Sequence, residues 1–143
     1  MLAWAIFPFP WQDWWAAGHV TAIDIQTEML SALARKAQRR GVSERITAHL
    51  ARPGSLDHLS KADFVLAFWM VHEVPNQPRF LTQIYNLLKP DGLFLLVEPI
   101  LHVPKKSFLQ TLETAEDIGF LIKKNPKIRI SHGALLVCNK GEK

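Results

Sequence analysis

An acidic side chain stands where a short apolar run of this chain ends. Asp24 closes the β-branched run at residues 20–25 (VTAIDI). A carboxylate at the end of a strand can accept two hydrogen bonds from the vicinal hydroxyls of a ribose. It could equally start a turn or help to cap the next helix. Asp24 alone does not decide between these roles.

A second group of candidates follows the apolar run at residues 63–69 (DFVLAFW). Phe68 and Trp69 close this run, and flat rings there could wall a purine; the alternative is core packing. His72 and Glu73 come next. An imidazole near neutral pH can accept a proton or orient a substrate, although a histidine satisfied by the backbone of a loop is the simpler interpretation.

A third candidate is Glu98, which ends the run at residues 93–97 (LFLLV) just before Pro99. It could contact a substrate or cap the chain locally. No metal site is predicted, because the six histidines lie far apart and no HxxxH or CxxC pattern occurs. Neither a GxSxG pattern nor a P-loop is present.

The composition narrows the class of protein. The chain has 143 residues, 48% of them hydrophobic, which suits one domain with a packed core over residues 1–143. The net charge of +4 comes from scattered basic residues, so we expect solvated faces and no nucleic-acid site. No run approaches about 18 apolar residues, which predicts no membrane span. Cys138 is the only cysteine and no signal-peptide pattern opens the chain, so we expect a cytoplasmic protein.

The candidate residues need strands and helices to position them, and the sequence predicts both in alternation. Strands are expected at residues 20–25, 46–50, 63–69 and 93–97, at 120–124 or 128–130, and at 134–138. Helices are expected to begin at Thr27, which could cap the first of them, and at Pro78, and to span residues 107–119. This alternation predicts a parallel sheet covered on both faces, with ligands at the carboxyl ends of the strands.

The order of these motifs resembles that of the class I S-adenosylmethionine-dependent methyltransferases, in the small-molecule branch with the ubiquinone-biosynthesis and type 11 members. The resemblance runs from about Gly18 to the C-terminus and rests on GHVTAIDIQTEML, DFVLAFWMVHEV, LLKPDGLFLLVEP and ISHGALLVCN. It implies an α/β fold, Rossmann-like and doubly wound, with a mostly parallel sheet and an antiparallel last strand. It also implies S-adenosylmethionine as cofactor and a small-molecule methyl acceptor. In that resemblance Asp24 holds the cofactor ribose and Ile25 packs near the adenine.

The chain departs from the family pattern at two places. An acid that binds the adenine amino group is missing after the third strand, where Ser55 or the backbone near Leu56 would substitute. The glycine-rich first motif is also missing, since Gly18 is the only glycine before Ala22. Residues 1–17 form an atypical aromatic segment instead. We expect residues 2–7 (LAWAIF) to fill the place of strand one, and residues 11–17 to form a short helix.

The tryptophan-rich start suggests an origin for this departure. Tryptophan has a single codon, so some codons of a shifted reading frame are fixed by the protein sequence. In that frame, the codons spanning Trp4–Ala5 and Trp15–Ala16 both encode glycine. We therefore hypothesise that residues 1–16 are a shifted reading of a methyltransferase gene.

The expected function is methyl transfer to a small molecule, with His72 and Glu73 on the acceptor side. The alternative is a non-catalytic remnant or binding module whose cofactor site is incomplete. A nicotinamide-dependent dehydrogenase is disfavoured: Tyr85 and Lys89 spell YxxxK, but Lys89 belongs to the LKPDG helix end and no GxxxGxG pattern occurs.

Overall fold

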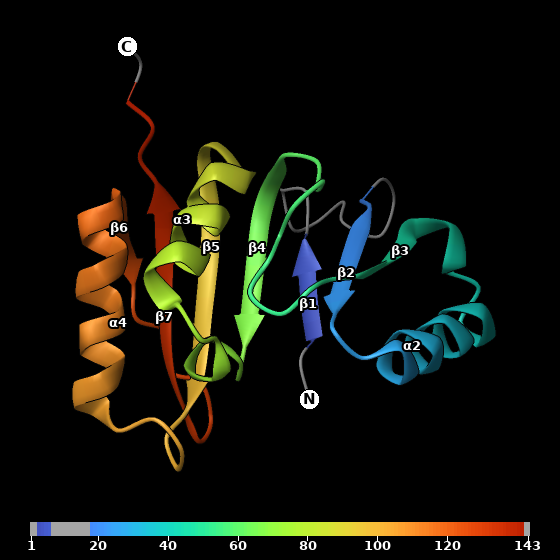
Figure 1. Cartoon of the computed structure of the whole chain (residues 1–143), viewed down its shortest axis with the longest axis horizontal. Coiled ribbons are helices and arrows are strands. Elements are labelled where there is room, and N and C mark those ends of the chain that lie inside the picture. Colours follow the sequence, from blue (N-terminus) through green and yellow to red (C-terminus); the bar gives the residue numbers. More distant parts are fainter. Residues whose placement is uncertain (1–2, 7–17, 142–143) are drawn as a thin grey trace.

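The computed structural model describes residues 3–6 and 18–141, which form strands alternating with helices (Figure 1). The strands are β1 (Ala3–Ile6), β2 (Val20–Asp24), β3 (Ile46–Leu50), β4 (Ala62–Phe68), β5 (Leu88–Pro99), β6 (Phe120–Lys124) and β7 (Ser131–Cys138). The helices are α2 (Thr27–Arg39), α3 (Gln77–Leu87) and α4 (Lys105–Ile118), with short 3-10 turns η1 (Ser43–Arg45) and η2 (Val71–Glu73). In the described part of the chain, no helix combines the length and apolar character needed to cross a membrane.

The helix ends follow from local chemistry. Asn76 caps α3 by accepting a hydrogen bond from the Arg79 N–H at 2.9 Å, and Pro78 lies in the first turn. Gly41, with φ of +66°, follows the end of α2. The prediction that Thr27 caps α2 is wrong. Gln26 occupies the cap position in an extended conformation and makes no side-chain cap bond.

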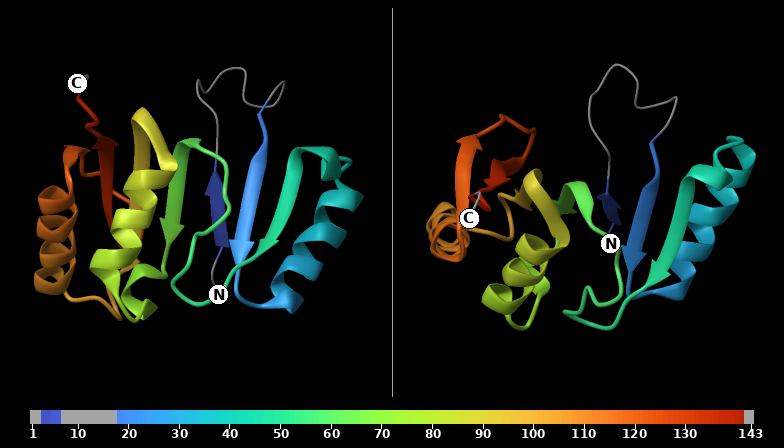
Figure 2. Two further views of the ribbon diagram at one scale, coloured as in Figure 1. Left: turned by 45° about the horizontal axis from the view of Figure 1, so that its top comes forward. Right: turned by 90° about the horizontal axis from the view of Figure 1, so that it is seen from above.

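The strands form a five-stranded sheet, in the order β1-β4-β5-β7-β6, and a two-stranded sheet of β2 and β3. β4 runs parallel to β5, and β2 runs parallel to β3, whereas β7 is antiparallel to both β5 and β6. Helices α3 and α4 pack together beside the larger sheet, while α2 lies against β2 and β3 (Figure 2). This is the Rossmann-like α/β architecture with an antiparallel last strand that the sequence predicted.

Strand β1 fills the place between β4 and β2 (Figure 1). Ala3–Ile6 therefore occupies the expected slot, but β1 is hydrogen-bonded to β4 and belongs to a different sheet from β2, so the sheet still divides there. Its direction also differs from that of a strand one. β1 pairs antiparallel with β4, so that Ala3 faces Phe68 and Ile6 faces Val65. Its carboxyl end thus points away from the carboxyl edge of β4. The predicted helix at residues 11–17 lies outside the described residues.

The core lies between the five-stranded sheet and helices α3 and α4. The inward face of α3 carries Phe80, Leu81, Ile84 and Leu87, which recur at helical spacing. These side chains pack with Val65 and Ala67 of β4, Phe94 and Leu96 of β5, Phe108 and Leu112 of α4, Phe120 of β6 and Leu136 of β7. A rigid core of this kind fixes the positions of the strand ends, where the candidate site residues lie.

Candidate functional site

A cleft of about 120 Å³ opens at the carboxyl ends of β2 and β3 and beside the segment that follows β4. It gathers four of the predicted cofactor residues, Asp24, Ile25, Ser55 and Leu56, together with Glu73 from the predicted acceptor pair. The remaining lining residues are Ile23, Ala51, Arg52, Pro53, Gly54, Met70, Val74, Pro75 and Phe80. Small-molecule sites typically measure about 300–1,000 Å³, so this cleft can enclose only part of a ligand as large as S-adenosylmethionine.

Asp24 reaches the cleft from the end of β2 with only 4% of its surface exposed. One carboxylate oxygen accepts a hydrogen bond from the Gln26 N–H at 2.9 Å, which holds the turn into α2. The turn-starting role considered from the sequence is therefore realised. A carboxylate has about four acceptor sites, so this bond still leaves capacity for the hydroxyls of a ribose.

Gln83 of α3 holds the loop that follows β3. Gln83 accepts from the Leu56 N–H at 2.8 Å and donates to the Gly54 carbonyl at 2.8 Å. The Ser55 hydroxyl donates to the Asp57 carboxylate at the next turn. Because both ends of its amide are used, Gln83 sets the position of this wall of the cleft. The sequence offered a signal for this loop, since Arg52–Ser55 lie two residues beyond the end of β3.

Phe68 and Trp69, the predicted purine wall, do not line this cleft. The Trp69 ring stacks on Phe68 at 5.2 Å between centroids, and its indole N–H donates to the Ser131 hydroxyl at 2.9 Å. Trp69 has a φ of +56°, uncommon for a bulky residue, and its backbone N–H donates to the Val97 carbonyl at 2.7 Å. Trp69 thus ties the end of β4 to β5 and β7. The apolar side chains that do line the cleft include Met70, which follows Trp69 at the end of the same apolar run, and also Val74 and Phe80.

His72 lies in η2, immediately after β4, and is held by a buried carboxylate. Glu98, at the end of β5, is 2% exposed, and its Oε1 accepts the Val71 N–H at 2.8 Å. Its Oε2 forms a short contact with His72 Nδ1. A carboxylate can only accept, so a neutral His72 ring that donates to Glu98 carries its proton on Nδ1 and has its lone pair on Nε2. Nε2 is 4.0 Å from the Glu73 carboxylate, on the side of the first cleft.

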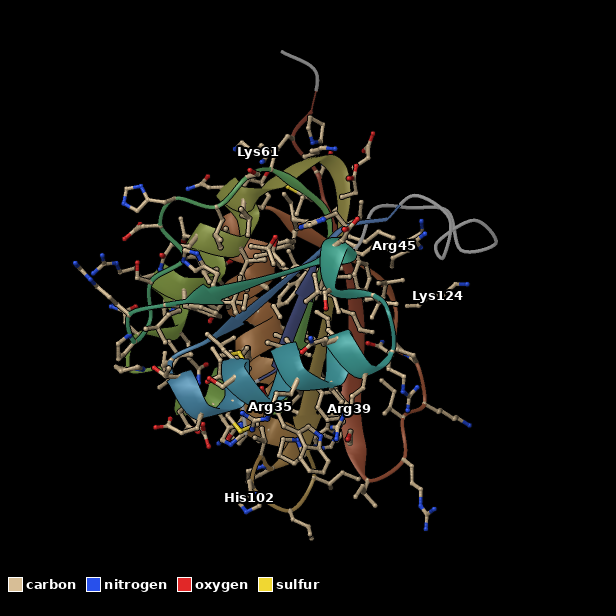
Figure 3. All side chains as sticks on the ribbon, turned by 90° about the vertical axis from the view of Figure 1, so that its right-hand side faces the viewer. Arg35, Arg39, Arg45, Lys61, His102 and Lys124 are labelled. Carbon is tan, nitrogen blue, oxygen red and sulfur yellow. The ribbon has the colours of Figure 1, made fainter. Side chains whose placement is uncertain are left out.

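A second cavity, of about 340 Å³, adjoins the same histidine. It lies between η2, the start of α3, the β5–α4 loop and α4, and Figure 3 shows His102 of that loop at one end of the molecule. The His102 ring is parallel to that of His72, with centroids 6.3 Å apart. The polar lining is otherwise neutral apart from Glu98, and includes Gln77, Ser107, Gln110, Thr111 and Thr114. His72 therefore lines the second cavity, while its neighbour Glu73 lines the first cleft.

The residues of the YxxxK pattern are occupied elsewhere. The Tyr85 hydroxyl donates to the Asn139 carbonyl at 2.8 Å, and Lys89 pairs with Asp63 at 2.9 Å. Neither residue lines either of the two cavities. Cys138 is fully buried, as expected for a core residue, and burial raises the pKa of its thiol. Across the described residues, no group of three His, Cys, Asp or Glu side chains could hold a metal ion.

Comparison with known proteins identifies the family. A family model described as "Methyltransferase domain" matches residues 9–96, which is more than half of the chain. The chain therefore belongs to the methyltransferase domain family, as its motifs indicated. No curated protein matches the chain.

Solved structures share the fold at low sequence identity. A SAM-dependent methyltransferase from Aquifex aeolicus is 18% identical, with a TM-score of 0.72, over 84% of this chain and 69% of that one. A methyltransferase from Pyrococcus furiosus is 16% identical, with a TM-score of 0.66, over 85% and 63%. The [4+2]-cyclase SpnF is 22% identical, with a TM-score of 0.66, over 76% of this chain but only 45% of its own. The chain thus spans between under half and about two thirds of these relatives.

Proposed function

We propose that this chain acts as an S-adenosylmethionine-dependent methyltransferase on a small-molecule acceptor. The observation that carries the proposal is the buried Asp24 carboxylate, which lines a cleft at the carboxyl ends of β2 and β3 together with Ile25, Ser55 and Leu56. Strand-end carboxylates in such sheets hold ribose hydroxyls. The family and its structural neighbours imply the same cofactor.

The described residues fit the adenosine part of this cofactor. Asp24 supplies the acceptor for a ribose, while Ile25, Met70 and Val74 supply apolar surface for a purine face. When bound, the cofactor supplies an electrophilic methyl group on a sulfonium. Methyl transfer depends mainly on holding the acceptor in line with that group, so it needs no elaborate catalytic signature.

The acceptor side of the proposed site is His72 with Glu73. Glu98 holds the His72 ring so that the Nε2 lone pair can take a proton from a hydroxyl or amine of the acceptor. The carboxylate also balances the charge that the ring then gains. The adjoining 340 Å³ cavity has room for a small acceptor, and its neutral hydrogen-bonding groups suit a polar one.

We expect fewer contacts to the methionine part of the cofactor than to its adenosine part. The chain has no glycine between its start and Gly18, and β1 carries the chain away from the carboxyl edge. A glycine loop after strand one is what lets the backbone approach a cofactor closely. We therefore expect weak binding, with Kd above about 1 mM, which corresponds to less than about 4 kcal/mol.

The test is a titration of the isotopically labelled chain with S-adenosylmethionine, followed by NMR. We expect the amide signals of Ile25, Ser55 and Leu56 to shift. The Asp24→Asn variant keeps an oxygen for the Gln26 N–H but loses the charge, and its affinity should fall by at least about tenfold, because two charge-assisted hydrogen bonds to the ribose weaken. Asp117→Asn, on the exposed end of α4, is the matched control and should bind like the parent chain.

The alternative is a non-catalytic remnant or binding module of the same fold. The antiparallel direction of β1 favours it, because no strand-one carboxyl end then reaches the cleft. A chain that shows no amide shifts near Asp24 at the highest soluble cofactor concentration would support this alternative and refute the methyltransferase proposal. Micromolar affinity would instead show that the missing glycines are not needed.

We further propose that residues 1–143 act as one domain and that the protein works in the cytoplasm. The single free and buried cysteine, Cys138, supports a reducing compartment. Fluorescence microscopy of the full chain with a C-terminal fusion would test the location, and exclusively extracellular signal would contradict it.

A further inference from the structure

Three large apolar side chains are exposed together at the carboxyl edge of the sheet. Ile100 and Leu101, in the β5–α4 loop, are 48% and 88% exposed, and Ile130, in the turn before β7, is 56% exposed. The Ile100 N–H donates to the Ile130 carbonyl at 3.1 Å, so the two turns are held side by side. Both turns lie at the bottom of Figure 1. We name these three residues the apolar tip.

Basic residues flank the apolar tip without any acid among them. Lys105 and Lys106 begin α4, and Lys127 and Arg129 precede Ile130; all four are exposed. No Asp or Glu occurs in residues 99–112 or in residues 118–141. We name these four residues the basic flank. This edge of the molecule therefore combines exposed apolar side chains with positively charged ones.

The placement of the two lysines is not explained by helix stability. The N-terminus of a helix carries a partial positive charge that favours acids and disfavours cations. Helix α2 follows this rule, with Glu28 in its first turn and Lys36 and Arg39 in its last. Helix α4 has no acid in its first turn and no base in its last, and begins with Lys105 and Lys106. A cation placed against the helix dipole points to a role outside the helix.

We propose that the apolar tip and the basic flank form a site for peripheral binding to an anionic lipid surface. Leucine and isoleucine side chains gain free energy by entering the interface between headgroups and acyl chains, while lysine and arginine are attracted to acidic headgroups. A nucleic acid would satisfy the charges but would offer little to Leu101. The site does not depend on the proposed methyl transfer.

Such binding would place the second cavity at the lipid surface. His102, Val103 and Pro104 line the 340 Å³ cavity and belong to the same β5–α4 loop as the apolar tip. A molecule resident in the interface could therefore enter the cavity without crossing bulk water. This orientation would bring amphipathic small molecules within reach of His72.

The test is co-sedimentation of the full chain with vesicles of phosphatidylcholine, alone and mixed with phosphatidylglycerol. We expect binding to the mixed vesicles only, weakening as salt is raised because the Debye length shortens. The double variant Leu101→Ser/Ile130→Ser should bind at least about tenfold more weakly. Leu121→Ser is its control, since Leu121 is 51% exposed on β6 at the opposite edge of the sheet.

Charge reversal gives the second arm of the test. Lys105→Glu/Lys106→Glu should also lower binding at least about tenfold. Arg35→Glu/Arg39→Glu makes the same change of net charge on α2, which lies beside β2 and β3 on the other side of the molecule from the β5–α4 loop (Figure 1), and should have a smaller effect. Circular dichroism and thermal unfolding verify that each variant is folded.

Three results would overturn the proposal. The first is no binding of the folded parent chain to mixed vesicles, and the second is equal loss in the test and control variants. The third is binding to duplex DNA that rivals vesicle binding and is insensitive to Leu101→Ser/Ile130→Ser, which would assign the basic flank to a nucleic acid. Failure of cofactor binding near Asp24 would leave this proposal intact.

Discussion

Replacing Glu98 by alanine should destabilise the fold by about 3 kcal/mol. Glu98 is 2% exposed, and its two oxygens accept from the Val71 N–H and from His72 Nδ1. A hydrogen bond to a charged group contributes about 1.5–3 kcal/mol, so the two bonds together contribute about 3–6 kcal/mol. The variant also removes a buried charge, and the desolvation cost of that charge disappears with it. The expected loss of stability therefore lies near the lower end of this range.

The Glu98→Gln variant should change which nitrogen of the His72 ring is protonated with little loss of fold stability. In Glu98→Gln the amide oxygen can still accept from Val71, and the amide N–H₂ can donate to His72 Nδ1. The fold should then lose only about 1 kcal/mol, because both contacts survive as neutral hydrogen bonds. The His72 ring, however, must carry its proton on Nε2 instead of Nδ1. The lone pair proposed to receive the acceptor's proton is therefore lost.

Urea unfolding and nitrogen NMR of the labelled histidine rings measure the two effects. The ring nitrogen shifts report which nitrogen carries the proton, without any need for cofactor. Glu116→Ala, at an exposed position of α4, is the control and should change stability by less than about 0.5 kcal/mol. Our account of the Glu98–His72 pair is refuted if Glu98→Ala unfolds like this control, or if Glu98→Gln leaves the tautomer of His72 unchanged.

Three further predictions concern the rest of the fold. Hydrogen exchange at Ala3–Ile6 should be slowed, since β1 pairs with β4, and exchange at the rate of an open chain would show that the strand does not form. Gly133→Ala should lower the free energy of unfolding by about 1–3 kcal/mol in a urea titration, because a Cβ there would lie 2.8 Å from the Pro126 carbonyl oxygen; an unchanged midpoint would contradict this. Cys138 has a raised pKa in the folded chain, so the thiol's contribution to stability is present below its usual pKa of 9.0 and is lost as pH rises above it. Cys138→Ala should therefore flatten the alkaline decline of stability in pH-dependent unfolding, and an equally steep decline would show that another group is responsible.

The sequence pattern predicted the bounds of two strands correctly. The strand at Ile46–Leu50 and the strand at Phe120–Lys124 have the expected bounds. The last strand begins three residues earlier than expected, at Ser131. Its first residues are not apolar, but they pair with Val97–Pro99 of the neighbouring β5. That pairing depends on tertiary structure, which a local pattern does not contain.

The sequence predicted only part of the candidate site, because a local pattern does not contain the contacts between distant segments. Because parallel strands share one carboxyl edge, strand-end reasoning brought Asp24, Ile25, Ser55 and Leu56 together correctly in one cleft. It did not foresee that the positive φ of Trp69 accompanies a side chain bonded to β7. It also considered His72 and Glu98 separately. Their contact follows from the parallel pairing of β4 with β5, which places the segment after β4 next to the end of β5.

The direction of β1 connects the unusual start of the sequence to the chemistry of the site. A sheet with an open slot between β2 and β4 would expose unpaired backbone groups, and an apolar segment of either direction can cover the β4 side of that slot. Only a parallel segment, however, would deliver its following loop to the cleft beside Asp24, and Ala3–Ile6 is antiparallel. A segment that fills the slot therefore needs only β-propensity. A segment that completes the cofactor site must also run parallel to β4 and be followed by a glycine loop. The hypothesis that residues 1–16 are a shifted reading of a methyltransferase gene stays a prediction. The gene's DNA tests it directly: the hypothesis fails if no single change of frame joins a glycine-rich motif to Gly18.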